Sequence, residues 1–416
     1  MVPARVDRSG HVRGQRVHGR KVDFKSALMQ NVTDTNLAID GGPKVRSAAL
    51  PKWPRFSSSC TGRIREILAG GNVNYWGGKY GVLFEQAFAR WIGLENAVAL
   101  SSGTAALHLA LEASGIGKGD EVVCTPYSFR ASATAAANVG AKMVFADVGQ
   151  DHMLTAQSVE KVLSPRTKAV IVVHLYGQVA DMGPLMKLAR KRSLKIIEDC
   201  AQCLGGEYKG RKVGTIGDVG CFSFCQNKHI TAGGEGGMLV CKSKSVARKA
   251  RSLRDHGWVV GSHPKKYNAI GYNFRITEIQ SAIALEEFSR LESWNLERRS
   301  RLSQMLIGKL SKSPIVKILP VDTPERRASF YLVPFVLDRR KLKVPVSRFI
   351  EALQAENVCA YKILWPLMAD KPVARGLVRD TVGFWVHPVY TKREVSEAVR
   401  AFYKVAGAYA KWNLQR

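Results

Sequence analysis

Short apolar runs alternate with helical segments from about residue 94, and this alternation constrains the fold more than any other feature of the chain. It predicts βαβ units, and therefore a parallel sheet covered by helices. In open α/β sheets, ligands bind at the carboxyl ends of the strands, so functional side chains are expected there. The strands are predicted at 97–100, 121–124, 142–145, 169–173 and 194–198, with helices at 131–139, 156–163 and 184–192 and a turn plus helix within 101–120.

The pattern changes after residue 276. Residues 277–310 are helical and charged, and they predict a long, kinked connecting helix. Beyond residue 313, a strand at 329–337 and helices at 347–356 and 393–410 indicate a smaller α+β domain.

The expected fold class is α/β, with a large domain at 41–290 that holds a mostly parallel central sheet flanked by helices, and a smaller C-terminal α+β domain at 291–416. Residues 1–40 are expected to be a basic, disordered tail. Within it, residues 1–28 are arginine-rich without helical periodicity, so they are either disordered or lie upstream of a natural start at Met29. A transit peptide is the alternative.

The net charge of +29 raises nucleic acid as a partner, but the basic residues are spread through helical stretches and no nucleic-acid-binding motif is present. The charge is expected to form a solvated surface or to attract an anionic substrate. No apolar run is long enough to cross a bilayer, and the eight cysteines are scattered through apolar segments. We therefore expect reduced thiols in a cytoplasmic protein, with no membrane partner.

Three features lie where strands end. "SSGTAALHLAL" (101–111) runs from a strand into a helix, so Gly103 and Thr104 suit a phosphate at the helix N-terminus; an ordinary N-cap is the alternative. Asp199 ends a buried strand, where a carboxylate either keeps a heteroaromatic nitrogen protonated or acts as a cap or ion-pair partner. Lys228 follows a strand and precedes a glycine cluster; a desolvated lysine is nucleophilic toward aldehydes, whereas most loop lysines are solvated.

Together these features form a phosphate cradle, a partner for a ring nitrogen and an amine for an aldehyde. Pyridoxal 5'-phosphate carries the three matching groups. The residues therefore predict this cofactor, linked to Lys228.

At this point the sequence resembles the DegT/StrS-type family of sugar aminotransferases, which have the aspartate aminotransferase-like (fold type I) architecture. The resemblance runs from about Gly41 to Arg299. It rests on motifs in order and spacing: "NYWGG" (74–78), "SSGTAALHLAL" (101–111), "GDEVVCTPYSF" (119–129), "FADV" (145–148), "VVHLYGQVADM" (172–182), "IIEDCAQ" (196–202), "GDVGCFSFCQNKHITAGGEGGM" (217–238) and "GYNFRITEIQSAI" (271–283).

The resemblance implies a role for each matching position. Lys228 corresponds to the Schiff-base lysine and proton carrier, and Asp199 to the partner of the pyridine nitrogen. Gln202 corresponds to a group near the ring hydroxyl, and Phe129 to an aromatic stacked on the ring. The phosphate contacts correspond to Gly103, Thr104, Ser223 and, from the neighbouring subunit of a homodimer, Asn273.

The family also implies the reaction: transfer of an amino group from glutamate or glutamine to a keto-sugar, often nucleotide-linked, or to a keto-cyclitol. Such enzymes serve polysaccharide or secondary-metabolite biosynthesis. Arg130, where similar sequences carry an aliphatic residue, either meets an anionic substrate or is a surface charge. The side chains expected near the substrate are Tyr75, Trp76, Arg130, Tyr176 and His229, the last with a purely structural role as its alternative.

Other readings remain open. Cys200, Cys203, Cys221 and Cys225 have a spacing that a zinc site could use, but the first pair brackets a predicted cofactor contact, so no metal is expected. The related sugar dehydratases are expected to carry histidine where Lys228 stands. A regulatory or nucleic-acid-binding protein that has lost activity is the remaining alternative; the joint presence of Asp199, Gln202, Ser223 and Lys228 argues against it.

Overall fold

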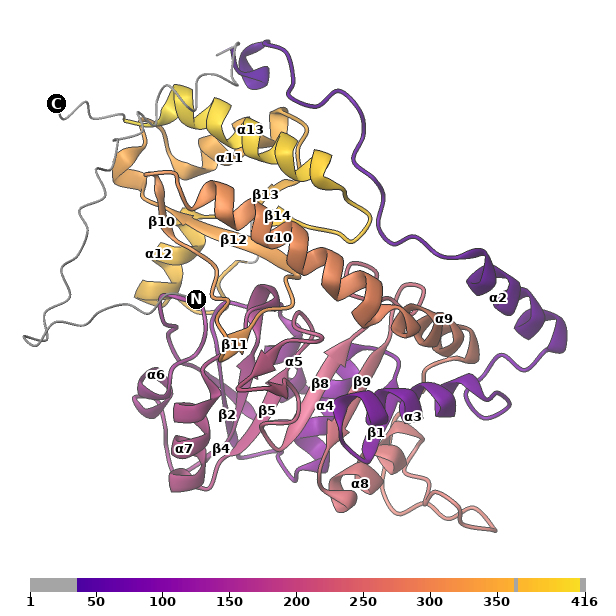
Figure 1. Ribbon diagram of the computed structural model, residues 1–416. Coiled ribbons are helices and arrows are strands. Elements are labelled where there is room, and N and C mark those ends of the chain that lie inside the picture. Colours follow the sequence, from indigo (N-terminus) through magenta and orange to yellow (C-terminus); the bar gives the residue numbers. More distant parts are fainter. Residues whose placement is uncertain (1–35, 363–365, 412–416) are drawn as a thin grey trace, which may run out of the picture.

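The large domain is built on a seven-stranded sheet with strand order β1-β9-β8-β5-β4-β2-β3 (Figure 1). The structure, a computed structural model, describes residues 36–362 and 366–411. Strands β8, β5, β4, β2 and β3 pair in parallel, while β9 is antiparallel to both of its neighbours. The strands are β1 (Asn96–Leu100), β2 (Glu121–Cys124), β3 (Lys142–Phe145), β4 (Thr167–Val173), β5 (Lys195–Asp199), β8 (Val219–Ser223) and β9 (Gly237–Cys241).

Helices flank this sheet, as the alternation predicts (Figure 1). The central strands are continuous apolar runs because both of their faces are covered. Helix α4 packs on β8 and β9 beside α5 and α8, and α7 packs on β5 beside α6. The helices are α3 (Tyr80–Ile92), α4 (Gly103–Ala113), α5 (Ala131–Asn138), α6 (Ala156–Glu160), α7 (Met182–Arg192) and α8 (Lys244–Arg254). The predicted fold class is confirmed.

The predicted kink in the connecting helix is a π-helical turn. Helix α9 (Glu278–Ser289) is followed by the π turn Leu291–Leu296 and then by α10 (Glu297–Leu310). A π turn inserts an extra residue into the helical ladder and so changes the direction of the helix. It places Asn295, which is buried, at the junction of the two domains.

The small domain packs helices against an antiparallel sheet of order β10-β12-β14-β13. Its core is a separate hydrophobic cluster in which α10 and α13 meet. Its elements are β10 (Val316–Ile318), β12 (Leu332–Leu337), α11 (Val346–Ala355), β13 (Ala360–Lys362), α12 (Pro372–Asp380), β14 (Thr381–Trp385) and α13 (Lys392–Tyr409). A third sheet joins β11 (Arg326–Arg327) to β6 (Glu207–Tyr208) and β7 (Arg211–Lys212) of the large domain.

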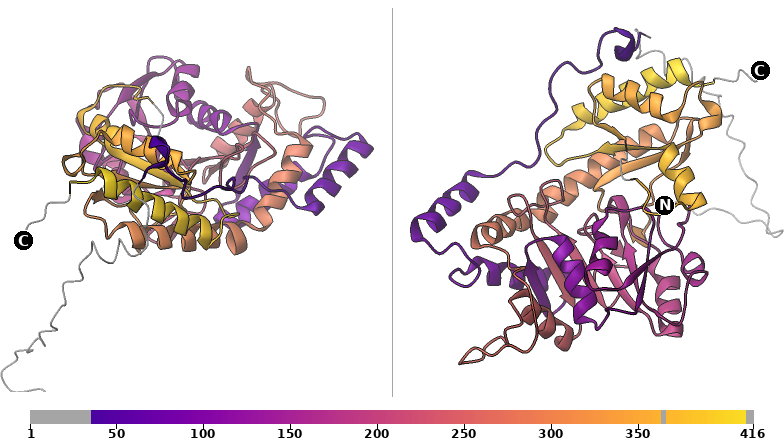
Figure 2. Two further views of the ribbon diagram at one scale, coloured as in Figure 1. Left: turned by 90° about the horizontal axis from the view of Figure 1, so that it is seen from above. Right: turned by 180° about the vertical axis from the view of Figure 1, so that it is seen from behind.

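The N-terminal segment lies against the small domain before it reaches the large one. Leu37 is buried in the small-domain core, and Arg46 forms ion pairs with Glu394 and Glu397 of α13. The chain then runs along the molecule to α2 (Ser58–Gly70), which packs on α9 (Figures 1 and 2). This course differs from the expectation that residues up to 40 form a tail and that those from 41 join the large domain. The predicted tail from 1 to 35 lies outside the described residues.

Within 36–362 and 366–411, no helix is both long and apolar enough to cross a membrane.

Candidate active site

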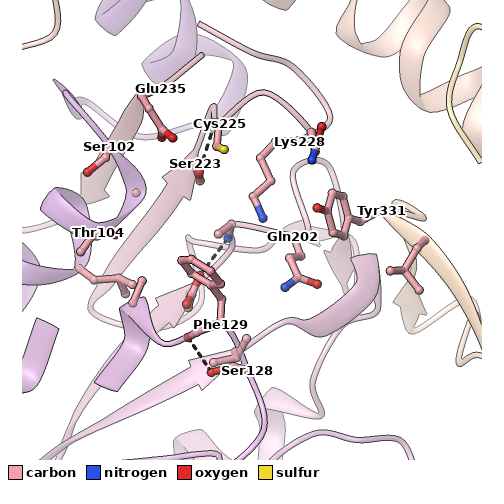
Figure 3. Close-up of a pocket in the computed structure, with 18 of the residues that line it drawn as sticks. Ser102, Thr104, Ser128, Phe129, Gln202, Ser223, Cys225, Lys228, Glu235 and Tyr331 are labelled. Atoms are coloured by element: carbon pink, nitrogen blue, oxygen red, sulfur yellow. Dashed lines mark hydrogen bonds between the residues drawn. The ribbon is translucent and has the colours of Figure 1, made fainter. Parts of the chain in front are cut away.

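A cavity of about 470 Å³ lies where the carboxyl ends of the parallel strands face the small domain (Figure 3). Seven of the eight residues predicted to bind a cofactor line it: Gly103, Thr104, Phe129, Asp199, Gln202, Ser223 and Lys228. The fold thus brings together side chains that are up to 125 residues apart in the sequence, from Gly103 to Lys228.

The N-terminus of α4 forms one end of the cavity. Ser102 caps the helix by accepting a hydrogen bond from the backbone N–H of Ala105 at 3.1 Å, and Gly103 is the first helical residue. A Cβ at Gly103 would lie 2.7 Å from Cβ of Ser223, so only glycine lets the helix approach the end of β8. The positive end of the helix and the Ser223 hydroxyl therefore face the same part of the cavity, a suitable cradle for a phosphate.

Asp199 stands at the end of β5 with both carboxylate oxygens engaged. Ser132 of α5 donates a hydrogen bond to it at 2.8 Å, and the Ala201 N–H donates another at 3.0 Å. Burial raises the pKa of Asp199, while these two donors and the Lys228 ammonium lower it. A protonated ring nitrogen in the cavity would act in the same direction as Lys228 and keep the carboxylate ionised.

Lys228 extends into the cavity from the loop after β8 (Figure 3). Burial lowers the pKa of its amine, which Asp199, Cys225 and Glu235 partly oppose. Nζ lies 4.6 Å from the centre of the Tyr331 ring. A desolvated amine loses its proton more readily, which makes it a better nucleophile and a better proton acceptor.

Phe129 and Gln202 approach the cavity from two other loops (Figure 3). Phe129 is 57% exposed, and it lies two residues before the start of α5. Gln202 is buried, and its Oε1 accepts a hydrogen bond from the Tyr176 N–H at 2.9 Å. That bond orients the amide, so its NH₂ group remains as the donor toward a ligand.

The sequence reasoning missed the wall that the small domain contributes. Tyr331, Leu332, Tyr361 and Trp385 line the cavity on that side. Tyr331 directly precedes β12, and the other three lie in β12, β13 and β14, which the sequence placed only as part of a smaller domain. It also missed Ser132, since a serine at the second position of a helix carries no signal for a distant carboxylate.

Six predicted residues do not line the cavity within this chain: Tyr75, Trp76, Arg130, Tyr176, His229 and Asn273. Tyr75 is buried and donates a hydrogen bond to Glu85, while Trp76 packs edge-on against Trp258. Arg130 and Asn273 are exposed. Tyr176 and His229 are buried behind the cavity wall, where Tyr176 donates to the Tyr127 hydroxyl at 2.8 Å and His229 contacts the Ser329 carbonyl at 3.0 Å.

The four thiols that could have formed a zinc site do not assemble into one in the described part of the chain. The one metal-compatible group found there combines Cys200 with His174 and Glu198. Glu198 already accepts hydrogen bonds from His174 and from three backbone N–H groups, so its oxygens are occupied by protein donors. The group of Cys200, His174 and Glu198 is therefore a structural hydrogen-bond network centred on Glu198.

The cavity therefore fits pyridoxal phosphate. The helix end and Ser223 match the phosphate, the Asp199 carboxylate matches the ring nitrogen, and the Lys228 amine matches the aldehyde. The glycine at 103 supports this fit, because a side chain there would collide with Ser223 and separate the two sides of the phosphate cradle.

Comparisons with known proteins agree with this geometry. The model of the DegT/DnrJ/EryC1/StrS aminotransferase family matches residues 56–384. The chain is similar to the UDP-N-acetyl-3-dehydro-alpha-D-glucosamine 3-aminotransferase of Acidithiobacillus ferrooxidans, with 44% identity over 53% of this chain and 60% of that protein. It is 35% identical to the L-glutamine:2-deoxy-scyllo-inosose aminotransferase of Streptomyces lividus, over 78% of this chain and 80% of that protein.

A solved structure, that of the aminotransferase from Psychrobacter cryohalolentis, superposes with a TM-score of 0.80 at 31% identity. The superposition covers 86% of this chain and 98% of the other.

Proposed function

Since the chain belongs to the DegT/DnrJ/EryC1/StrS aminotransferase family, a family of pyridoxal-phosphate-dependent transaminases, we propose that it transfers an amino group from glutamate or glutamine to a keto-sugar or keto-cyclitol. One observation carries the proposal. The Lys228 amine, the Asp199 carboxylate and the N-terminus of α4 line a single cavity.

Pyridoxal phosphate, when bound, supplies an electrophilic aldehyde and a cationic ring that accepts electron density from the carbon being deprotonated. Lys228 would hold it covalently, while Gly103, Thr104 and Ser223 would hold its phosphate. The Asp199 carboxylate would favour a proton on the ring nitrogen, and Phe129 would offer an aromatic surface to the ring.

Lys228 then acts as the acid and base of the reaction. With the cofactor and amino donor bound, the free Nζ would take the proton from the donor's α-carbon and hold it for return later in the transfer. This role requires a neutral amine. Burial lowers the pKa of Lys228 and so favours the neutral form. The same residue carries the proton in the opposite sense when the keto acceptor receives the nitrogen.

The choice of substrates rests on the relatives. The Streptomyces lividus protein is named for glutamine and a keto-cyclitol, and the Acidithiobacillus ferrooxidans protein for a UDP-linked keto-sugar. The aromatic wall of Tyr331, Tyr361 and Trp385 supports an acceptor with a ring, because the C–H faces of a sugar or cyclitol pack well on aromatic surfaces.

The proposed enzyme works as a homodimer. Asn273 is exposed and lies away from the cavity of its own chain, which supports a role at the phosphate site of a second copy. Tyr75 and Trp76 belong to the N-terminal part of the large domain and would serve the substrate only through such an assembly.

The test is transfer of labelled nitrogen. Glutamine and glutamate carrying ¹⁵N in the α-amino group are each incubated with the cofactor-loaded protein and either 2-deoxy-scyllo-inosose or a UDP-linked 3-keto-sugar. We expect ¹⁵N in the amino product of at least one pair, and none with Lys228→Ala. Loss of a hydroxyl group without nitrogen uptake would indicate a dehydratase instead. A protein that takes up no cofactor would favour the regulatory alternative.

A further inference from the structure

Arg299 of α10 is a fully buried cation without a carboxylate partner among the described residues. Its Nε donates to Asn295 Oδ1 at 2.8 Å, and its remaining bonds go to backbone carbonyls. Burial lowers the pKa of Arg299 to about 10. A buried charge without a counter-charge is costly, and an apolar side chain of similar volume would often be tolerated better. A guanidinium here therefore indicates a role that depends on its several fixed donors.

One end of this network holds the loop that carries Lys228. The Asn295 Nδ2 group donates to the His229 carbonyl, while the Trp53 indole donates to the Lys228 carbonyl at 3.2 Å. The Arg299 guanidinium lies 5.7 Å from the centre of the Trp53 ring. Two consecutive carbonyls at the lysine are thus fixed by side chains that meet at Arg299.

The other end holds the aromatic wall of the cavity. Arg299 Nη1 donates to the carbonyls of Phe330 and Tyr331, both at 3.3 Å, and to that of Val386 at 3.1 Å. Tyr331 itself lines the cavity beside Lys228 (Figure 3), and Val386 follows the lining residue Trp385. Phe330 has a φ of +52°, which a bulky residue rarely adopts without support from its surroundings.

We propose that Arg299, acting through Asn295, is a positioning residue that fixes the Lys228 loop of the large domain against the Tyr331 wall of the small domain. This sets the place of Nζ relative to the carbon it deprotonates. Displacing a catalytic group by about 1 Å can slow its reaction about a hundredfold, so the position of Nζ affects turnover directly. The kinetic consequence rests on the proposed function. The hydrogen bonds from Arg299 through Asn295 to the lysine loop are present without cofactor.

The neighbouring Arg298 offers a matched control. Its Nε and Nη2 donate to the carbonyls of Pro388 and Tyr390 at 2.6 and 2.8 Å. It therefore ties the same helix to the same segment of the small domain, but it forms no bond to the lysine loop or to a cavity-lining residue. Arg299→Lys and Arg298→Lys each keep the charge and remove the fork of donors.

The first readout is hydrogen exchange of the full-length protein without cofactor. The Lys228 N–H donates to the Cys225 carbonyl, and its protection reports on the order of the loop. We expect exchange at this amide to rise about tenfold in Arg299→Lys and to change less than about twofold in Arg298→Lys. Equal effects of the two variants, or no effect of Arg299→Lys, would overturn the proposal.

A second variant covers the case in which Arg299→Lys does not fold. Trp53→Phe keeps a ring beside His387 but removes the hydrogen bond to the Lys228 carbonyl. It should therefore raise the exchange rate of the Lys228 N–H by a similar factor. Unchanged exchange in Trp53→Phe would then overturn the proposal.

The second readout is kinetic. With cofactor bound, Arg299→Lys should lower kcat about tenfold or more and leave KM for the amino donor within about threefold, because an interaction needed for the chemical step is lost while substrate contacts stay. A rise in KM at constant kcat in Arg299→Lys would contradict the proposed positioning role of Arg299. If Lys228 never carries the cofactor, the proposed function fails, and the exchange experiment still decides whether Arg299 braces the loop.

Discussion

Replacing Glu198 by glutamine tests how the fold secures the neighbouring Asp199. Glu198 is fully buried, and its carboxylate accepts four hydrogen bonds. Oε1 accepts from the backbone N–H groups of Ile216 and Gly217 at 2.8 and 2.7 Å. Oε2 accepts from the Gly214 N–H at 2.9 Å and contacts Nε2 of His174 at 3.1 Å.

The expected loss of unfolding free energy follows from how many of the four hydrogen-bond donors a glutamine side chain can still accept from. His174 Nδ1 accepts from the Ala180 N–H, so Nε2 carries a ring hydrogen that points at Glu198. A glutamine can present its oxygen to Ile216 and Gly217, but its NH₂ then faces two donors. Each orphaned buried donor costs about 1–3 kcal/mol, so Glu198→Gln should lose about 4 kcal/mol of unfolding free energy.

The assay is urea unfolding of the large domain at neutral pH, with Glu207→Gln as the control. Glu207 is half-buried and forms one rim ion pair with Arg327 at 3.3 Å, so its replacement should cost less than about 1 kcal/mol. A loss of unfolding free energy below about 1 kcal/mol for Glu198→Gln would refute the reasoning that the carboxylate anchors the backbone at 214–217.

The pH dependence has a definite sign. Burial raises the pKa of Glu198, but the hydrogen bonds from His174 and the backbone donors outweigh it, so the pKa in the folded state lies below the ordinary glutamate value of 4.5. The stability from this group is therefore present above about 4.5 and is lost as the pH falls through the lowered folded-state pKa. The difference between wild type and Glu198→Gln should shrink in that acid range.

Two further predictions concern the cavity, and a third concerns the net charge. Ser132→Ala removes the 2.8 Å donor to Asp199, so the pKa of that carboxyl should rise and kcat should fall about tenfold, measured as a pH–rate profile against wild type; an unchanged profile would show that Ser132 has no influence. Gly103→Ala places a Cβ 2.7 Å from Ser223 and should weaken cofactor binding about tenfold or more in a fluorescence titration, whereas Gly308→Ala in α10 serves as a control with open space around it. If the net charge of +29 steers a diphosphate-bearing acceptor, kcat/KM for it should fall as salt rises, and a flat profile would exclude steering.

The large domain could be predicted from sequence because its signals are local. Buried parallel strands read as apolar runs, and the glycine and carboxylate at their ends mark the edge where ligands bind. Asp199, at the end of β5, and Lys228, in the loop after β8, could therefore be predicted to lie together, and both line the cavity.

The rest depends on tertiary packing. The course of the N-terminal segment follows from long-range contacts such as Arg46 with Glu394, which no local pattern encodes. The aromatic wall requires the position of the small domain, and Ser132 and Arg299 form hydrogen bonds with groups that are distant in sequence. For Tyr75 and Trp76 the family motif predicts a place near the substrate, whereas local sequence gives no sign that the Tyr75 hydroxyl donates to Glu85 within its own chain.

The most direct test of the account is mass spectrometry of the protein after incubation with pyridoxal phosphate, reduction with borohydride and digestion. We predict that the mass of the reduced cofactor is found on the peptide containing Lys228, and that Lys228→Ala abolishes this modification. Cofactor fixed on a different lysine, or on none, would contradict the claim that this side chain is the covalent centre of the site.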